Sequence, residues 1–211
     1  MRFKEILIAV LVTAFVVSLF FKITDDKVQK APAAKGGTLS QSADHHSGSP
    51  QISTEVFGKL LDKEAPDFTL ENYEGKKVNL KSLRGKSVIL FFSEGLMCYP
   101  ACWDQIAAFG KDQKLNNENT VTLTIVNDRR ADWKSALKKM PELATAQVLF
   151  DTDRSASVAY GVLSLPSSMH RGQLAGHTYV VIDKEGIVRF VKDDPQMAIR
   201  NQELLGEVSK F

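Results

Sequence analysis

The chain has 211 residues, of which 44% are hydrophobic and 25% are charged, and its formal net charge is +2. This length suits one globular domain with an appendage and excludes two large domains. Because the charge balance is nearly neutral and no basic stretch is interleaved with aromatic residues, the composition gives no support to nucleic-acid binding. The two cysteines, Cys98 and Cys102, are too close together to staple distant segments and too few for a four-ligand zinc site.

The first 22 residues are typical of a membrane anchor or a signal segment. Arg2 and Lys4 precede an uncharged, mostly apolar run over residues 6–21. The length of this run lies between that of a signal-peptide core and that of a short membrane span. No small-x-small cleavage site follows at the expected distance, so we expect an uncleaved, single-pass transmembrane helix.

Two signals about the orientation of this anchor oppose each other. Arg2 and Lys4 favour a cytoplasmic N-terminus, whereas four lysines between residues 22 and 35 favour a cytoplasmic location for the rest of the chain. Export is the usual fate of a basic start followed by an apolar core, and a dithiol suits an oxidising compartment. We therefore expect the domain on the extracytoplasmic side of the cell membrane.

A flexible linker is predicted over residues 23–57, followed by the folded domain over 58–211. The linker is rich in Ala, Gly, Ser, Lys and Asp and has no apolar periodicity, so it cannot bury enough surface to order itself. His45 and His46 lie within it. Without further ligands nearby, we interpret this pair as solvated linker residues.

The elements of the domain follow from their patterns in chain order. Alternating apolar and polar residues over 65–80, around a Glu74-Gly75 turn, predict an N-terminal β-hairpin. The continuous apolar run over 87–93 predicts a central strand that is covered on both faces. The remaining expected elements are a helix from Pro100, a strand at 121–126, a helix at 131–140, a strand at 147–151, a helical turn at 155–160, a hairpin over 178–191, and a final helix capped by Asp194 and Pro195. This order predicts an α/β sandwich with a mixed central sheet and helices on both faces.

The two cysteines lie at the start of the helix predicted from Pro100. Proline disfavours helical geometry at the residue before it and suits the first helical position, which places Cys98 just before the helix and Cys102 in its first turn. Because the partial positive charge of a helix N-terminus stabilises a thiolate, Cys98 is the predicted catalytic nucleophile. Cys102 is then the predicted resolving thiol, within disulfide reach. Two small core residues, or a structural disulfide, are the alternative.

Four other residues near the pair are candidates for supporting roles. Glu94 could exchange a proton with the attacking thiol, although a solvated loop charge is the commoner role of such a residue. Met97, Tyr99 and Trp103 could form an apolar rim that receives a partner peptide, with core packing as the alternative for Trp103.

Several ordered motifs carry a family resemblance: APDFTL at 65–70, KSLRGK at 81–86, FDTDRS at 150–155 and TYVVIDKEG at 178–186. Together they resemble the redoxin branch of the thioredoxin superfamily, which comprises the AhpC/TSA (peroxiredoxin-like) proteins and the extracytoplasmic thiol-disulfide oxidoreductases. The resemblance covers residues 58–211. It implies a thioredoxin-like sandwich and an antioxidant-type thiol-disulfide oxidoreductase that acts on a protein thiol or disulfide and needs no cofactor.

The chain departs from the peroxiredoxin pattern at two positions. Peroxiredoxins present Pro-x-x-x-Thr-x-x-Cys at this strand end, whereas Gly95 stands three residues before Cys98. The arginine of that family falls on Gly176 here, and Arg171 is only a remote substitute. An atypical thiol peroxidase is therefore an alternative rather than the leading hypothesis.

The spacing of the cysteines also resembles that of the Sco-type copper chaperones, another branch of the same fold. Their two thiolates are joined by a histidine just before a late strand, and His177 precedes the strand predicted from residue 178. Two thiolates and one imidazole form a soft site that suits copper, so copper binding by Cys98, Cys102 and His177 is a second alternative. Pro166 is a candidate for the cis-proline that faces the dithiol in thioredoxin relatives.

Overall fold

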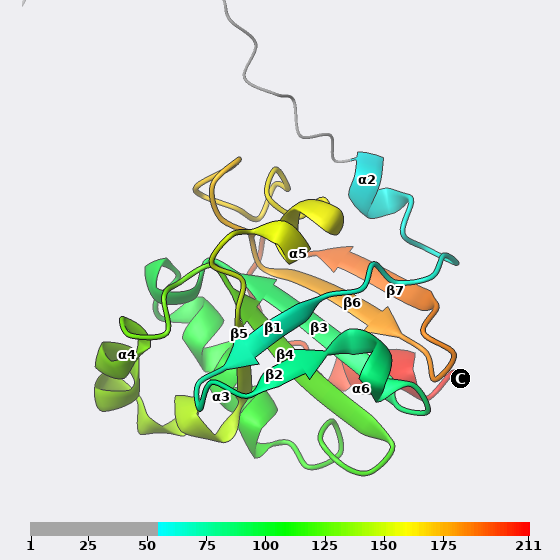
Figure 1. Ribbon diagram of the computed structural model, residues 1–211, viewed down its shortest axis with the longest axis horizontal. Helices are drawn as coiled ribbons and strands as arrows, with labels where there is room; N and C mark the ends of the chain where they lie inside the picture. The colour runs from blue at the N-terminus through cyan, green and yellow to red at the C-terminus, as the bar shows by residue number, and fades with distance from the viewer. Residues whose placement is uncertain (1–54) are drawn as a thin grey trace, which may run out of the picture. The chain divides into compact units, whose positions relative to one another are not determined.

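A seven-stranded mixed sheet lies at the centre of the computed structural model, which describes residues 55–211 (Figure 1). Its strand order is β2-β1-β5-β4-β3-β6-β7. The three inner strands β5, β4 and β3 are parallel, while β1, β6 and β7 pair in antiparallel fashion with their neighbours. The strands are β1 (Thr69–Asn72), β2 (Lys77–Asn79), β3 (Ser87–Ser93), β4 (Thr120–Val126), β5 (Gln147–Phe150), β6 (Thr178–Ile182) and β7 (Val188–Asp193).

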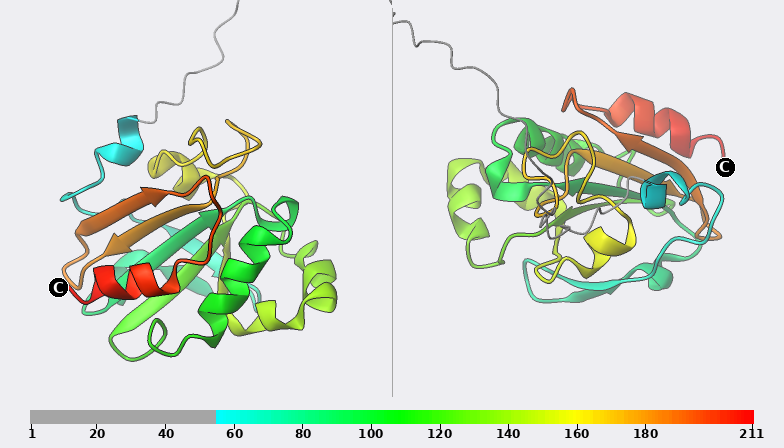
Figure 2. Two further views of the ribbon diagram at one scale, coloured as in Figure 1. Left: turned by 180° about the vertical axis from the view of Figure 1, so that it is seen from behind. Right: turned by 90° about the horizontal axis from the view of Figure 1, so that it is seen from above.

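Helices cover both faces of this sheet (Figure 2). Helices α3, α4 and α6 contribute buried side chains to the cluster on one face, and α2 and α5 contribute to the cluster on the other. The helices are α2 (Glu55–Gly58), α3 (Ala101–Lys111), α4 (Trp133–Lys139), α5 (Ser155–Ala159) and α6 (Asn201–Val208), with short 3-10 turns η1 (Leu80–Leu83), η2 (Gly95–Met97) and η3 (Pro141–Thr145). The predicted α/β sandwich with a mixed sheet is confirmed.

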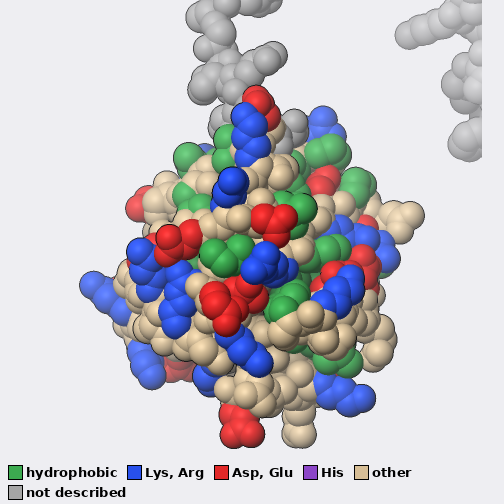
Figure 3. All heavy atoms as spheres, turned by 90° about the vertical axis from the view of Figure 1, so that its right-hand side faces the viewer, with side chains coloured by type: hydrophobic (Ala, Val, Ile, Leu, Met, Phe, Trp, Pro, Cys, Tyr) green, Lys and Arg blue, Asp and Glu red, His purple; other side chains and the backbone are tan. Residues whose placement is uncertain are grey.

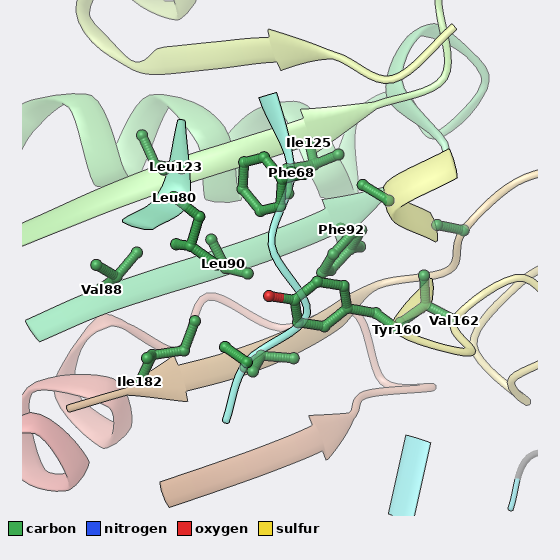
Figure 4. Close-up of a cluster of buried hydrophobic side chains, with 14 of the residues drawn as sticks. Phe68, Leu80, Val88, Leu90, Phe92, Leu123, Ile125, Tyr160, Val162 and Ile182 are labelled. Carbon is green, nitrogen blue, oxygen red and sulfur yellow. The ribbon is translucent and has the colours of Figure 1, made fainter. Parts of the chain in front are cut away.

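Strand β3 is the central strand that the apolar run predicted, and every one of its residues is buried. Successive side chains of a strand point to opposite faces. Ile89 and Phe91 therefore pack in the cluster that contains α3, while Leu90 and Phe92 enter the opposite cluster. Figure 4 shows this second cluster, in which the rings of Phe92 and Tyr160 are 5.1 Å apart between centroids. The strand is thus packed on both faces, and its carboxyl end leads directly into the segment that carries the cysteines.

The N-terminal hairpin forms as predicted. Thr69 of β1 pairs with Asn79 of β2, and Gly75 in the turn has φ of 82°, a conformation that glycine adopts without steric cost.

Figure 3 shows one face of the molecule on which acidic and basic side chains are interspersed, in agreement with the formal net charge of +2.

Two expectations about prolines are wrong. The last helix begins at Asn201 rather than at Pro195, because Met197 takes a positive φ of 50° and the Asp194 carboxylate caps a turn by accepting from Ala198 N at 3.1 Å. The only cis peptide bond in residues 55–211 is Tyr99–Pro100, so Pro166 is not the cis-proline.

The packed domain includes residues at the end of the segment that was predicted to be linker. Phe57 of α2 is buried in the hydrophobic cluster that also contains Leu90 and Tyr160. The predicted anchor over 1–22, and the linker up to residue 54 with His45 and His46, lie outside the described residues. Among residues 55–211, no helix combines the length and apolar character needed to cross a membrane.

Candidate functional site

Cys98 and Cys102 form a disulfide just beyond the carboxyl end of β3, with their Cα atoms 5.4 Å apart. The 3-10 turn η2 carries the chain from β3 to Cys98. The Cys98 carbonyl accepts a hydrogen bond from Cys102 N at 3.0 Å, so Cys98, three residues before the first residue of α3, is bonded to Cys102 in the first turn of the helix. Cys102 is therefore in the first helical turn as the sequence predicted, whereas α3 begins at Ala101 with Pro100 as its N-cap, one residue later than predicted.

The disulfide lies just below the molecular surface. Cys98 is 3% exposed and Cys102 is fully buried. On either side of Cys98, Met97 is 59% exposed and Tyr99 is 50% exposed, so these two side chains form an apolar rim. Trp103 does not belong to this rim, because it is buried and its indole Nε1 donates to the Gly95 carbonyl at 3.0 Å.

His177 lies against the inner sulfur of the pair. Its Nδ1 is 3.5 Å from Cys102 Sγ, its side chain is fully buried, and the ring of Phe91 packs edge-on against it at 4.7 Å between centroids. Burial lowers the pKa of His177 to about 4, although the nearby Asp194 carboxylate acts in the opposite direction. The imidazole is consequently neutral at physiological pH.

The structure brings together the three residues of the copper hypothesis. The sulfurs of Cys98 and Cys102 and a ring nitrogen of His177 lie within 4.8 Å of one another. Two sulfurs and one imidazole fit a soft metal ion. The fit applies only to the reduced dithiol, because the sulfurs of a disulfide offer no thiolate.

A chain of hydrogen bonds continues from His177 into the interior, and sequence analysis missed it. His177 Nε2 lies 2.7 Å from the Tyr179 hydroxyl, which donates to Gln105 Oε1 at 2.9 Å. His177 immediately precedes β6, and Tyr179 on β6 follows it by two positions, so the two side chains point to the same face of the sheet. Gln105 follows Cys102 by three positions on α3 and so shares its side of the helix. These two spacings could have pointed to both residues.

Glu94 is neither a solvated loop charge nor a group in contact with the sulfurs. Its side chain is 1% exposed, and its Oε1 accepts hydrogen bonds from Ser168 Oγ, Met169 N and His170 N at 2.9, 2.6 and 2.9 Å. Burial alone raises its pKa, but the hydrogen bonds, first of all that with His170, bring the pKa below its ordinary value. Glu94 thus ties the loop between α5 and β6 to the end of β3.

Asp128 is a second acidic residue beside the cysteine segment. Its Oδ2 accepts from Leu96 N at 2.9 Å, and Gly95, with φ of 57°, packs directly against it. Burial raises the pKa of Asp128 to about 6, although the bond from Leu96 partly opposes this shift. Sequence analysis did not single out this residue.

Gly176 occupies the position at which the arginine of peroxiredoxins was expected. A Cβ atom at Gly176 would collide with the hydroxyl of Ser167 and the backbone of Ser168, so a long side chain does not fit there without rearrangement of the loop. Arg171 instead donates to the Pro166 carbonyl at 3.1 Å and makes no contact with either cysteine. The loop around Gly176 therefore leaves no room for an arginine side chain at this position.

Comparison with known proteins places these features in a family. Residues 61–191 match the AhpC/TSA family. The chain belongs to the AhpC/TSA family. It is similar to the chloroplastic peroxiredoxin Q of Triticum aestivum, with 32% identity over 132 residues that cover 60% of this chain and 55% of the relative. The chain thus spans little more than half the length of that relative.

Two further curated relatives show the same range of similarity. The chloroplastic peroxiredoxin Q of Sedum lineare is 30% identical over 67% of this chain and 74% of its own length. The thiol-disulfide oxidoreductase ResA of Bacillus thuringiensis subsp. konkukian (strain 97-27) is 28% identical over 64% of this chain and 70% of its own length.

Solved structures agree with the fold assignment. The mitochondrial 2-Cys peroxiredoxin from Plasmodium falciparum superposes with a TM-score of 0.59 at 25% identity, covering 71% of this chain and 92% of that chain. AhpC from Enterococcus faecalis superposes with a TM-score of 0.61 at 18% identity, covering 72% and 91%. The redoxin resemblance and the thioredoxin-like fold that it implied are confirmed.

Proposed function

We propose that this chain is a thiol-disulfide oxidoreductase that exchanges its Cys98–Cys102 disulfide with the thiols or disulfides of a partner protein. The observation that carries the proposal is the bonded pair of sulfurs at the start of α3, below the exposed rim of Met97 and Tyr99. Membership of the AhpC/TSA family and similarity to a protein named as a thiol-disulfide oxidoreductase support it.

Cys98 is the attacking residue in this proposal. In the reduced protein the Cys98 thiolate is stabilised by the partial positive charge at the N-terminus of α3. Cys98 also retains a small exposed surface, whereas Cys102 has none. The thiolate attacks a partner disulfide, forming a Cys98–partner bond as the bond within the partner breaks. Cys102 then attacks the Cys98 sulfur and releases the partner as a dithiol, so two electrons pass from the chain to the partner.

Serine substitutions test this division of roles. We expect Cys98→Ser to abolish reduction of a model disulfide, because the remaining sulfur is buried, and Cys102→Ser to accumulate a mixed disulfide through Cys98. The two variants are matched, since each exchanges one sulfur for one oxygen, yet their expected outcomes are opposite. Unaltered reduction of the model disulfide by Cys98→Ser protein would show the proposal to be wrong.

A thiol peroxidase is the second candidate, and similarity to several peroxiredoxin Q proteins favours it. The glycine at position 95 and the tightly packed Gly176 speak against it, because neither position offers the hydroxyl or the guanidinium expected of a peroxiredoxin. Rapid oxidation of reduced Cys98 by hydrogen peroxide, faster than by a disulfide, would favour the peroxidase.

Copper binding is a third candidate, favoured by the approach of Cys98, Cys102 and His177 within 4.8 Å. It requires the dithiol form of the protein. Stoichiometric Cu(I) in the reduced, reconstituted protein, lost in His177→Ala, would support this role.

We further propose that residues 1–22 tether the domain to the cell membrane and that the domain lies on the extracytoplasmic side. The support is the apolar run over 6–21 with its basic flank.

A further inference from the structure

Backbone groups fix the orientation of two buried amide side chains behind the disulfide. Gln105 Oε1 lies 2.7 Å from Arg200 N, and a backbone N–H can only donate, so the oxygen of Gln105 must point there. Asn201 Nδ2 lies 3.1 Å from the Ala108 carbonyl, which can only accept. The remaining contact, from Gln105 Nε2 to Asn201 Oδ1 at 2.8 Å, agrees with both assignments.

These assignments determine where the hydroxyl proton of Tyr179 points. The hydroxyl has two neighbours that can only accept, Gln105 Oε1 at 2.9 Å and the Ala198 carbonyl at 3.2 Å. If the single proton of Tyr179 went to His177 instead, both of these oxygens would face the Tyr179 oxygen with no hydrogen between them, so we assign the proton to one of the two oxygens. The third neighbour, His177 Nε2 at 2.7 Å, must therefore donate to the Tyr179 oxygen.

Because the ring proton is on Nε2, Nδ1 is unprotonated. A neutral imidazole carries one proton, and Asp194 and Arg200, the charged side chains that act on His177, are paired with each other at 2.8 Å. The lone pair of Nδ1 consequently faces Cys102 Sγ at 3.5 Å. Among residues 55–211, no other polar side chain lies within hydrogen-bond distance of that sulfur.

Cys102 needs such an acceptor for the second step of exchange. A thiol must lose its proton before it attacks a disulfide, and desolvation opposes ionisation of a fully buried thiol. Cys102 has no exposed surface, so bulk water cannot take the proton directly.

We propose that His177 is the catalytic base for Cys102 and that Tyr179 is the positioning residue that holds its tautomer. This inference rests on the exchange function proposed above. As Cys102 Sγ bonds to Cys98 Sγ, the Cys98–partner bond breaks, the partner sulfur leaves as a thiolate, and the Cys102 proton passes to His177 Nδ1. In the reverse direction Nδ1 returns the proton to the departing Cys102 sulfur.

The two steps can be separated by reacting the reduced protein with excess 5,5′-dithiobis(2-nitrobenzoate). Attack by Cys98 releases one coloured thiolate at a rate that depends on reagent concentration. Ring closure by Cys102 releases a second at a rate that does not. We expect His177→Phe, which keeps a buried ring, and His177→Asn to slow the second phase by about 10²-fold or more, as loss of a general base does. The first phase should change less than about twofold, because Cys98 attacks before the base acts.

Tyr179→Phe and Tyr160→Phe form a matched pair of controls. Tyr160 is a buried tyrosine in the other hydrophobic cluster, where its hydroxyl donates to the Pro66 carbonyl at 2.8 Å. We expect Tyr179→Phe to slow only the second phase, by less than the His177 variants, and Tyr160→Phe to change neither phase.

Nitrogen-15 spectra of the unaltered protein test the tautomer without any substitution. The His177 ring should show a protonated Nε2 and a bare Nδ1, and this preference should weaken in Tyr179→Phe. A protonated Nδ1 in the unaltered protein, or an unchanged second phase in both folded His177 variants, would overturn the inference. Absence of the first phase in the unaltered protein would instead refute the proposed exchange function.

Discussion

Asp128 shows how a single half-buried carboxyl group can make the stability of the cysteine segment depend on pH. It accepts a hydrogen bond from Leu96 N at 2.9 Å, and burial raises its pKa from 3.8 to about 6. A raised carboxyl pKa means that the folded state holds the proton more tightly than the unfolded state. The resulting stabilisation is fully present below about pH 4 and is lost as the pH rises through about 6.

We predict that Asp128→Asn stabilises the protein at neutral pH. The amide oxygen can still accept from Leu96 N–H, but no charge is buried, so the free energy of unfolding at pH 7.5 should rise by ~1–2 kcal/mol, less than the full pKa shift implies. Below pH 4 the variant and the unaltered protein should differ little. Urea unfolding at the two pH values measures this, with exposed Glu118→Gln as a control expected to show no such difference. A gap that is the same at both pH values would contradict the prediction.

A site residue could be predicted from the sequence only where its role depends on residues close to it in the chain. Cys98 and Cys102 were found because proline and helix-end preferences act within a few residues. Glu94 was misread because its partners, Ser168 and His170, are 74 and 76 residues away, and no local pattern announces them. Asp128 was overlooked for the same reason, since its hydrogen-bond donor Leu96 lies 32 residues earlier.

At the scale of elements, local patterns predicted the strands well and the last helix poorly. The continuous apolar run of β3 and the alternating pattern with a Glu-Gly turn in the N-terminal hairpin are each typical of one structure only. The Asp194-Pro195 pair fits a helix cap equally well as a turn, and the turn forms because Asp194 binds the guanidinium of Arg200. This ion pair depends on the folded arrangement of the chain, so sequence periodicity could not reveal it.

The loop between α5 and β6 provides a prediction about an element. Glu94 accepts three hydrogen bonds from this loop through one oxygen and contacts His170 Nδ1 through the other. We predict that Glu94→Gln lowers the free energy of unfolding by ~1–3 kcal/mol, because an amide cannot satisfy all of these donors. Hydrogen exchange at the amides of Met169 and His170 should also accelerate.

The pH dependence of the stability difference, and a second variant that removes only one of the contacts, check this prediction. The pKa of Glu94 is lowered in the folded protein, so its stabilisation is present above the ordinary value of 4.5 and is lost as the pH falls through the folded-state pKa. The difference between Glu94→Gln and the unaltered protein should therefore shrink in acid. His170→Ala, which removes the side-chain contact only, should have a smaller effect. Unchanged protection of the Met169 and His170 amides in Glu94→Gln would contradict the prediction that Glu94 holds this loop.

On the scale of the whole molecule, the fold is held by the sheet and by hydrophobic clusters on its two faces. The cysteines belong to one cluster only, in which Ile89, Phe91 and Ile106 are also buried, and the opposite cluster contains no cysteine. The disulfide joins residues four positions apart, so it constrains little of the unfolded chain. A protein that exchanges its disulfide with a partner must stay folded in both redox states, and this arrangement suits that requirement.

We therefore predict that reduction of the disulfide lowers the free energy of unfolding only modestly. Closure of so short a loop contributes about 2 kcal/mol in the chain-entropy treatment, and both hydrophobic clusters persist when the bond opens. Urea unfolding with and without reductant should give one cooperative transition in each state, with similar dependence on urea concentration because the buried surface is nearly the same. The variant with both Cys98→Ser and Cys102→Ser should not respond to reductant. Loss of cooperative unfolding on reduction would mean that the disulfide is a structural staple, and the proposed exchange cycle would then lack a stable reduced state from which Cys98 could attack.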